Sequence, residues 1–312
     1  MRIQRSYKPK RTSAKTWPAL ICIIVGLLIL SGLLGRPFNA VSEKVAPTTN
    51  TIPFDNSKIY NDTNWTYDFS QLKDGPLSSN DWNFEAGSVI SKYNEEAQIY
   101  TGRTENVRIE NSTLVLEARK EDMLGYRYTS ARINTKDYFS FTYGELEVEM
   151  MLPQGVGTWP ATWLLPAGRE YNPADYRVAS EDKFSFAFNG EIDFAESIGS
   201  IPGENIPAAH SYNSLRQKPL YTPVHVMNPY TEFHRYGIIK KSNEIIFTLD
   251  GVPYASRKKK SNNPMDWPFD QPYYLIINLA IGGKWAGEKG IDDSSAPWQL
   301  KIKSIRYKYL SY

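Results

Sequence analysis

Cysteine is almost missing from this sequence of 312 residues, in which Cys22 is the only one. A domain that lacks a second cysteine cannot form an intramolecular disulfide, so a hydrophobic core must hold it together. Histidine is also scarce, with three residues, and neither an H-E-x-x-H motif nor a Cys/His cluster occurs. The sequence therefore predicts no zinc site.

The chain after its N-terminal 44 residues carries no excess of positive charge. After residue 44 the chain carries 28 basic and 33 acidic residues. Proteins that bind nucleic acid neutralise phosphates and need the opposite balance, so we expect no nucleic-acid partner. The same part of the chain lacks convincing helical periodicity and internal repeats.

The N-terminal segment has a different composition. Residues 1–16 contain six basic residues and no acid, and residues 17–35 form an uncharged, largely apolar run. About 18 apolar residues are enough to span a bilayer, and basic residues before the span keep the N-terminus in the cytoplasm. We therefore expect a basic cytoplasmic segment, a transmembrane signal anchor or signal peptide at 17–35, a linker at 36–58 and an exported domain at 59–312.

Cleavage after this apolar run would need small residues at the cleavage site. The nearest candidate, Phe38-Asn39-Ala40, has a bulky residue at the first small position. This favours an uncleaved anchor, which makes the protein a single-pass membrane protein with its folded domain outside the cell. A cleaved signal peptide, which would release a secreted protein, remains the alternative.

The sequence pattern of the exported part is typical of an all-β protein, with short runs of alternating apolar and polar residues between turn residues. Asp250-Gly251 predicts a hairpin turn. We expect a two-sheet β-sandwich, most simply a jelly roll whose bent sheets leave one concave face. The clearest strand candidates are residues 113–118, 144–150, 244–249, 273–279 and 300–309.

The stretch NGEIDFAES at residues 189–197 places three acids close together in one strand candidate. Glu191 and Asp193 share a face because side chains alternate along a strand. Glu196 would point to the opposite face of a regular strand, but a bulge of one residue returns it to the acidic face. We therefore predict a bulge between Asp193 and Glu196.

Crowded carboxylates raise one another's pKa, so at least one acid of the row should stay protonated near neutral pH. A protonated acid beside an ionised one is the pair that retaining glycoside hydrolysis uses, at a separation of about 5–5.5 Å. A solvated acidic strand face, or a bulged edge that resists aggregation, is the alternative interpretation of so short a pattern.

Aromatic residues make up 13% of the chain. Most of the tryptophans should pack in the core, but Trp159 and Trp163 lie four residues apart in GTWPATWLL. An aromatic face in a groove suits the apolar side of a sugar ring.

Several segments, in order, resemble glycoside hydrolase family 16, and in particular its laminarinase branch with the bulged E-x-D-x-x-E motif. These segments are EIDFAE at 191–196, GTWPATWLLP at 157–166, NEEAQIYT at 94–101, YTSARI at 128–133, YGELE at 143–147, FHRYG at 233–237 and NLAIGGKW at 278–285. The resemblance covers about residues 63–312. It implies a concanavalin A-like jelly roll with a concave substrate cleft, and a catalytic domain at 59–312.

The resemblance also implies roles for individual residues. Glu191 matches the nucleophile, Glu196 the general acid/base and Asp193 the acid that orients the nucleophile. The expected sugar contacts are Asn94, Arg132, Trp159, Trp163, His210 and Trp285. Without the resemblance, His210 would be interpreted as a structural histidine. The resemblance favours a structural role and a sugar contact equally. This chemistry needs no metal and no organic cofactor.

Lys303 and Lys240 depart from the family pattern, and residues 257–260 form a separate basic run. Many members bind a structural calcium ion, and Asp68 matches one ligand, but Lys303 stands where the second acid would be. Lysine cannot bind calcium, so we expect no ion there and Lys303 near Asp68. Lys240 stands where a tryptophan is common. Residues 257–260, RKKK, predict a solvated loop, with anionic lipid or an acidic glycan as the alternative partner.

The sequence thus predicts a monomeric endo-acting hydrolase of β-1,3-linked glucan with a retaining mechanism. Within the same family, hydrolysis of mixed-linkage β-glucan or galactan, or transglycosylation, is the alternative. A carbohydrate-binding surface protein without turnover is the alternative from another class, but binding alone gives no reason for three crowded carboxylates.

Overall fold

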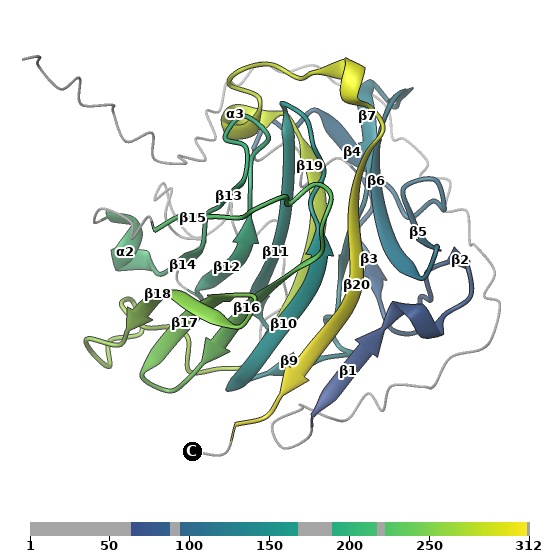
Figure 1. Cartoon of the computed structure of the whole chain (residues 1–312). Coiled ribbons are helices and arrows are strands. Elements are labelled where there is room, and N and C mark those ends of the chain that lie inside the picture. The colour runs from purple at the N-terminus through teal and green to yellow at the C-terminus, as the bar shows by residue number, and fades with distance from the viewer. Residues whose placement is uncertain (1–63, 88–93, 168–188, 217–221, 311–312) are drawn as a thin grey trace, which may run out of the picture.

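The computed structural model describes residues 64–87, 94–167, 189–216 and 222–310 (Figure 1). The predicted cytoplasmic segment, membrane helix and linker at 1–58 lie outside the described residues. Among the residues that are described, no helix is long and apolar enough to cross a membrane.

Two β-sheets, almost entirely antiparallel, pack face to face in the described part of the chain (Figure 1). This confirms the predicted two-sheet sandwich. The large sheet contains, in spatial order, β18 (Val252–Lys258), β17 (Glu244–Leu249), β16 (His234–Lys240), β10 (Gly144–Met151), β20 (Trp298–Lys308), β6 (Thr113–Met123), β5 (Val107–Glu110) and β2 (Gly75–Pro76), with β1 (Trp65–Asp68), β7 (Tyr126–Ser130) and β4 (Gln98–Tyr100) paired beside this path.

The small sheet carries the acidic strand. Its order is β14 (Ala208–His210), β12 (Glu191–Glu196), β11 (Thr158–Pro166), β19 (Tyr273–Ile281), β8 (Arg132–Asn134) and β3 (Asn83–Phe84), with β9 (Ser140–Phe141) also paired to β19. The remaining elements are β13 (Glu204–Asn205), β15 (Val224–His225), the short helices α2 (Tyr212–Arg216) and α3 (Gly283–Ala286), and the 3-10 turns η1 (Phe69–Gln71) and η3 (Asp293–Ser295).

The five strand candidates are confirmed as β6, β10, β17, β19 and β20. The predicted hairpin joins β17 to β18, and its turn residues Asp250 and Gly251 have φ values of 52° and 79°. Positive φ at both central residues is the type I′ geometry that matches the twist of paired strands.

The core lies between the two sheets and follows the alternation of their strands. In the small sheet, Ile133, Leu164, Ile192 and Ile277 are fully buried against the large sheet. Burying each such side chain contributes about 1.5–3 kcal/mol. Residues one position away point to the opposite face of the small sheet, which carries polar side chains together with a small apolar cluster of Leu165, Tyr274 and Ile276.

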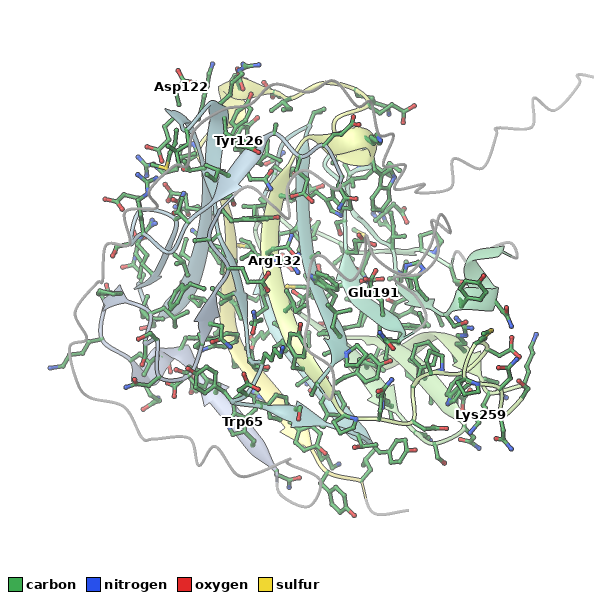
Figure 2. The ribbon with its side chains drawn as sticks, turned by 180° about the vertical axis from the view of Figure 1, so that it is seen from behind. Trp65, Asp122, Tyr126, Arg132, Glu191 and Lys259 are labelled. Atoms are coloured by element: carbon green, nitrogen blue, oxygen red, sulfur yellow. The ribbon has the colours of Figure 1, made fainter. Side chains whose placement is uncertain are left out.

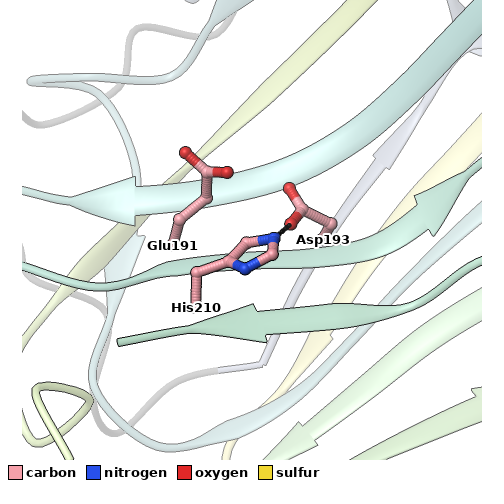
Figure 3. Close-up of side chains that lie close together, drawn as sticks. All are labelled: Glu191, Asp193 and His210. Atoms are coloured by element: carbon pink, nitrogen blue, oxygen red, sulfur yellow. Dashed lines mark ion pairs between the residues drawn. The ribbon is translucent and has the colours of Figure 1, made fainter. Parts of the chain in front are cut away.

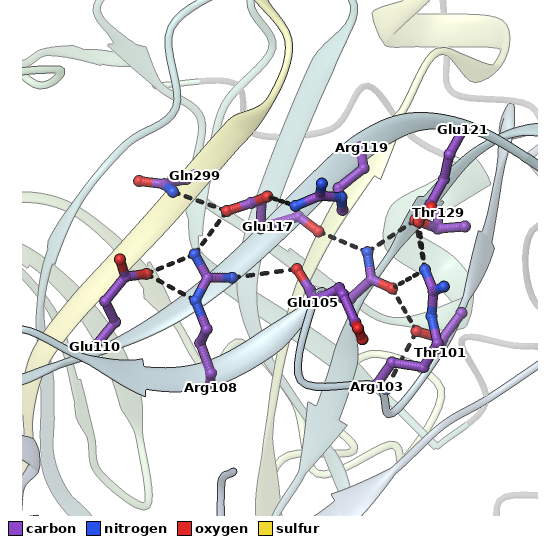
Figure 4. Close-up of polar contacts among 11 residues, drawn as sticks. Thr101, Arg103, Glu105, Arg108, Glu110, Glu117, Arg119, Glu121, Thr129 and Gln299 are labelled. Atoms are coloured by element: carbon purple, nitrogen blue, oxygen red, sulfur yellow. Dashed lines mark hydrogen bonds and ion pairs between the residues drawn. The ribbon is translucent and has the colours of Figure 1, made fainter. Parts of the chain in front are cut away.

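A polar cluster fixes the loop between β4 and β5 to the outside of the large sheet (Figure 4). Asn106 is fully buried and donates to the carbonyl of Glu117 at 3.0 Å and to Thr129 Oγ1 at 2.9 Å. Its own oxygen accepts from Thr101 Oγ1 and from Arg103. Each polar atom of this buried amide therefore has a partner.

The predicted approach of Lys303 to Asp68 is wrong. The bulge between β10 and β20 at Glu149 leaves Lys303 as an extra residue, and its Nζ lies 3.3 Å from Glu149 Oε1. Hydrogen bonds from Ser70 lower the pKa of Asp68, and the cation that adds to this effect is Arg306.

The predicted solvated loop at 257–260 is also wrong for two of its residues. Lys258 and Lys260 are exposed, but Arg257 is half-buried with three hydrogen bonds, and Lys259 lies 2.6 Å from Asp270. The loop therefore does not present four free cations.

Candidate active site

The predicted bulge in the acidic strand is confirmed. In the pairing of β12 with β11, Thr162 lies opposite Ala195 and Trp163 opposite Asp193, so Phe194 is the extra residue. Beyond the bulge, Glu196 lies opposite Ala161. The bulge shifts the alternation by one position, as re-aiming Glu196 requires.

The strand register places all three acids on one face, since residues directly opposite in a sheet share a face. Ala161 and Trp163 are two apart on β11, so their partners Glu196 and Asp193 lie on the same side. On the other edge of β12, Glu191 lies opposite His210 and Asp193 opposite Ala208. The acid row, Glu191, Asp193 and Glu196, therefore occupies the face of the small sheet that points away from the core.

Core packing behind the row fixes its position. Ile192, Phe194 and Ala195 are buried between the sheets. Gly190, just before the strand, has φ +81°, and a Cβ atom there would lie 2.4 Å from the Tyr273 hydroxyl oxygen. That hydroxyl donates to the carbonyl of Asn189 at 2.9 Å. The start of β12 is thus held against β19.

Burial and crowding raise the pKa of each acid in the row to about 8. Burial is the largest cause in all three. The negative charge of Asp193 further raises the pKa of Glu191 and of Glu196. Positive groups act in the other direction: His210 and Arg132 lower the pKa of Glu191, whereas His210 is the cation that lowers that of Glu196. The row therefore retains protons at neutral pH.

His210 lies beside the row on the neighbouring strand β14 (Figure 3). Its Nε2 is 3.1 Å from Asp193 Oδ2, and both side chains are largely buried. The contact is an ion pair when the imidazole is protonated. Glu191, Asp193 and His210 offer donor atoms within 4.8 Å of one another, but we assign no metal to them because the imidazole already covers the Asp193 oxygen.

Glu196 has a specific hydrogen-bond donor in Trp159, as its Oε1 accepts from the indole Nε1 at 2.9 Å. This hydrogen bond lowers the pKa of Glu196 against the larger effect of burial. The Trp159 ring meets the Trp285 ring edge-on, with centroids 5.3 Å apart. Two of the three predicted aromatic contacts thus lie next to the acid at the C-terminal end of the row.

A second aromatic group lies opposite Asp193. Trp163 donates from Nε1 to Asn278 Oδ1 at 2.8 Å, and the Arg132 guanidinium lies over its ring, 4.8 Å from the centroid. Arg132 Nε is also 3.0 Å from Glu85 Oε2. Figure 2 shows Arg132 and Glu191 within the sheet region and Lys259 at the periphery of the molecule. The face that carries the acids therefore continues across β11 and β19 to β8.

Asn94 is connected to this face through Glu96, a residue that the sequence did not identify as part of the site. Its amide donates to Glu96 Oε1 at 3.0 Å. Glu96 is buried and accepts from Gln98 at 2.6 Å and from Tyr100 at 3.1 Å. The i, i+2, i+4 spacing of Glu96, Gln98 and Tyr100 is a signal that could have predicted this cluster.

Two further cations, Lys240 and Arg257, have buried or half-buried surroundings that the sequence did not predict. Lys240 is fully buried, and burial lowers its pKa to about 7. It donates to the carbonyls of Thr142 and Gln271 and lies over the Tyr273 ring, 4.9 Å from the centroid. Arg257 contacts the strand of His210, as described below. His225 and His234 pair with Glu204 and Asp250.

Comparisons with known proteins agree with this arrangement. Residues 94–303 match the protein family described as glycosyl hydrolases family 16. A β-glucanase from Rhodothermus marinus is 36% identical over 248 residues, which cover 77% of this chain and 82% of the relative. A glucan endo-1,3-beta-glucosidase A1 from Niallia circulans is 29% identical and is covered over 36% of its length. The X-ray structure of the laminarinase from Rhodothermus marinus superposes with a TM-score of 0.70 at 34% identity, covering 79% of this chain and 97% of that one.

Proposed function

Since this chain belongs to glycosyl hydrolases family 16, we propose that it is an endo-acting hydrolase of β-1,3-linked glucan that retains the anomeric configuration. The names of its relatives, β-glucanase and glucan endo-1,3-beta-glucosidase, support the substrate class. The single observation that carries the mechanism is the bulge at Phe194, because it gathers two glutamates and an aspartate on one face.

In the first step, Glu191 attacks the anomeric carbon while Glu196 gives its proton to the leaving glycosidic oxygen. The surroundings support these roles. Burial and the charge of Asp193 raise the pKa of both glutamates, which keeps a proton in the row for the leaving oxygen, and the charges of His210 and Arg132 favour the ionised form of Glu191. The step breaks the glycosidic bond and forms a glycosyl ester on Glu191.

In the second step, the same groups exchange roles. Glu196, now ionised, removes a proton from a water molecule, whose oxygen attacks the anomeric carbon and releases Glu191. The indole of Trp159 stabilises the ionised Glu196 through its hydrogen bond of 2.9 Å. Asp193, between the two glutamates, orients them and raises the pKa of both.

Aromatic and amide groups on the same face supply the sugar contacts in this proposal. Trp159, Trp163 and Trp285 offer apolar surface to pyranose rings, and Asn94 and Arg132 offer hydrogen-bond donors. Hydrogen bonds and stacking already fix the tryptophans, which reduces the entropy lost on binding.

The test compares the purified full-length chain with Glu191→Gln and Glu196→Gln on laminarin, lichenan, agarose and carrageenan. We expect the wild type to release reducing ends from laminarin. Each variant should lose about 10³-fold or more in kcat, because it lacks the nucleophile or the acid. Glu244→Gln, on β17, is the control and should keep full activity.

The products distinguish the remaining alternatives. A retained anomeric configuration in the first product supports double displacement, and an inverted one would exclude it. Release from lichenan or from the galactans alone would reassign the substrate. Binding of laminarin without release, in wild type and Glu191→Gln alike, would identify a carbohydrate-binding protein.

The location of the enzyme is a separate part of the proposal, and it depends on the sequence at 1–58. Basic residues followed by the apolar run at 17–35 support a single-pass anchor with the catalytic domain outside the cell. Fractionation of cells that express the full chain tests this. Activity in the alkali-washed membrane pellet is the expected result, and activity in the medium would indicate cleavage.

A further inference from the structure

Arg257 connects the edges of the two sheets at the point where His210 enters the site. It comes from β18, the edge strand of the large sheet, and reaches β14, the edge strand of the small sheet. Figure 1 shows β18, β14 and α2 gathered at the same side of the sandwich. Among the strands that the structure describes, no pairing joins the two sheets there, so a side chain makes the connection.

The guanidinium donates hydrogen bonds to the residues on either side of His210. It donates to the carbonyl of Ala209 and, at 2.7 Å, to Ser211 Oγ. A third bond, of 3.0 Å, goes to the carbonyl of Asp266. The guanidinium also lies over the Phe269 ring, 5.3 Å from its centroid. Such a planar fork with several fixed donors is a geometry that lysine cannot reproduce.

The strand that Arg257 contacts has few other partners in the described part of the chain. β14 has three residues, all paired on one side with β12, and no described strand pairs with its other edge. Edge strands present backbone groups that need partners, and Arg257 supplies one to Ala209. The loop that follows β18 also connects to α2. Its Asp266 accepts hydrogen bonds from Asn213 of α2 at 2.7 Å and from Ser261 at 2.7 Å.

We propose that Arg257 is a positioning residue that sets the place of His210 against the acid row. Through Ala209 and Ser211 it fixes the backbone of His210, whose Nε2 lies 3.1 Å from Asp193 Oδ2. Arg257 thus acts on Glu191 and Glu196 without touching them. This inference rests on the proposed function of the acid row.

The test compares Arg257→Met, which removes every donor at nearly the same length, with Lys258→Met as the matched control. Lys258 is the adjacent residue, and its side chain is 76% exposed. We expect Arg257→Met to lower kcat on laminarin about tenfold with little change in KM, while Lys258→Met leaves both unchanged. Arg257→Lys keeps the charge but not the planar guanidinium, so its kcat should lie between those of Arg257→Met and Lys258→Met.

The pH profile separates positioning from a loss of folded protein. His210 lowers the pKa of Glu191 and Glu196, so its displacement should move both limbs of the profile to higher pH. Arg257→Met and His210→Ala should shift the profile in the same direction, and the double variant should behave like His210→Ala alone. A uniform fall in rate at every pH, or effects that add in the double variant, would overturn the proposal.

A readout without turnover keeps the inference testable if the proposed function fails. The chain has three histidines, so the imidazole signals of isotope-labelled histidine can be assigned by substitution in NMR spectra. The His210 signals should move in Arg257→Met and stay in Lys258→Met. Unchanged His210 signals in a folded Arg257→Met protein would refute the positioning role, whatever the activity of the wild type.

Discussion

At the scale of single residues, Glu196 has two neighbours that change its pKa in opposite directions. Asp193 raises it through negative charge, and Trp159 lowers it through a hydrogen bond that the ionised form accepts. A general acid must be protonated at the working pH, so these two neighbours, together with burial and His210, set the upper limit of the active pH range.

Two substitutions should therefore move the basic limb of the pH–rate profile in opposite directions. Asp193→Asn removes a negative charge and lowers the pKa of Glu196, so this limb should move down by about one pH unit or more. The acidic limb should move down too, because Asp193 also raises the pKa of Glu191. Trp159→Phe removes a hydrogen bond to the ionised form, and the basic limb should move up by about one unit.

Profiles of kcat/KM on a soluble laminarin oligosaccharide give both limbs. Trp163→Phe is the control, because its indole donates to Asn278 and not to an acid of the row. If Asp193→Asn and Trp159→Phe moved the basic limb in the same direction, Glu196 would not be the group that this limb reports.

At the scale of elements, the loop between β4 and β5 depends on one buried amide. Asn106→Ala should leave the carbonyl of Glu117 and the hydroxyls of Thr101 and Thr129 short of a partner. Buried groups that lose their hydrogen bonds cost about 1–3 kcal/mol, so we expect the free energy of unfolding to fall by about 2–4 kcal/mol. Denaturation by urea measures this loss.

Glu105→Ala is the matched control, since Glu105 lies in the same loop and its side chain is exposed. Its unfolding free energy should stay within about 0.5 kcal/mol of the wild type. The kcat of Asn106→Ala should stay unchanged at 25 °C, because the loop contacts the large sheet and not the acid row. An equal loss in both variants would show that Asn106 has no special role.

The strands that could be predicted from sequence are those in which local pattern and tertiary environment agree. The last strand alternates because one face is buried, and the predicted 300–309 became Trp298–Lys308. The bulge at Phe194 followed from the spacing of three acids, because chemistry requires them on one face. The N-terminal span lies outside the described residues and stays a prediction.

The positions of Lys240 and Arg257 were not predicted, because contacts between segments far apart in the sequence determine them. Lys240 ends β16 and reads as a surface residue, yet its partners Thr142 and Gln271 lie far away in sequence. Arg257 precedes three lysines and reads as part of a basic loop, although its bonds go to Ala209 and Ser211. No periodicity or spacing encodes such contacts, since they arise only when the segments that carry them come together in the fold.

At the scale of the whole molecule, the acid row should reduce stability at neutral and alkaline pH. The folded pKa values of Glu191, Asp193 and Glu196 are about 8, well above the values of 3.8–4.5 for free carboxyls. The folded state therefore binds more protons than the unfolded state between these limits, so the unfolding free energy falls as pH rises from about 4.5 to about 8. Lys240 works in the other direction above pH 7, because its pKa is lowered to about 7 and the unfolded state keeps the extra proton.

The difference between wild type and Glu191→Gln isolates the contribution of the row, because Lys240 affects both proteins equally. At pH 8 the wild type must bury charge at crowded carboxylates, and removal of one should raise Tm by at least about 3 °C, or roughly 1 kcal/mol. At pH 4.5 the row is protonated, and the two Tm values should agree within about 1 °C. Glu244→Gln should follow the wild type at both values of pH. If Glu191→Gln were no more stable at pH 8 than at pH 4.5 relative to wild type, the carboxylates would not be crowded in solution, and the acid row could not hold the shared protons on which the mechanism depends.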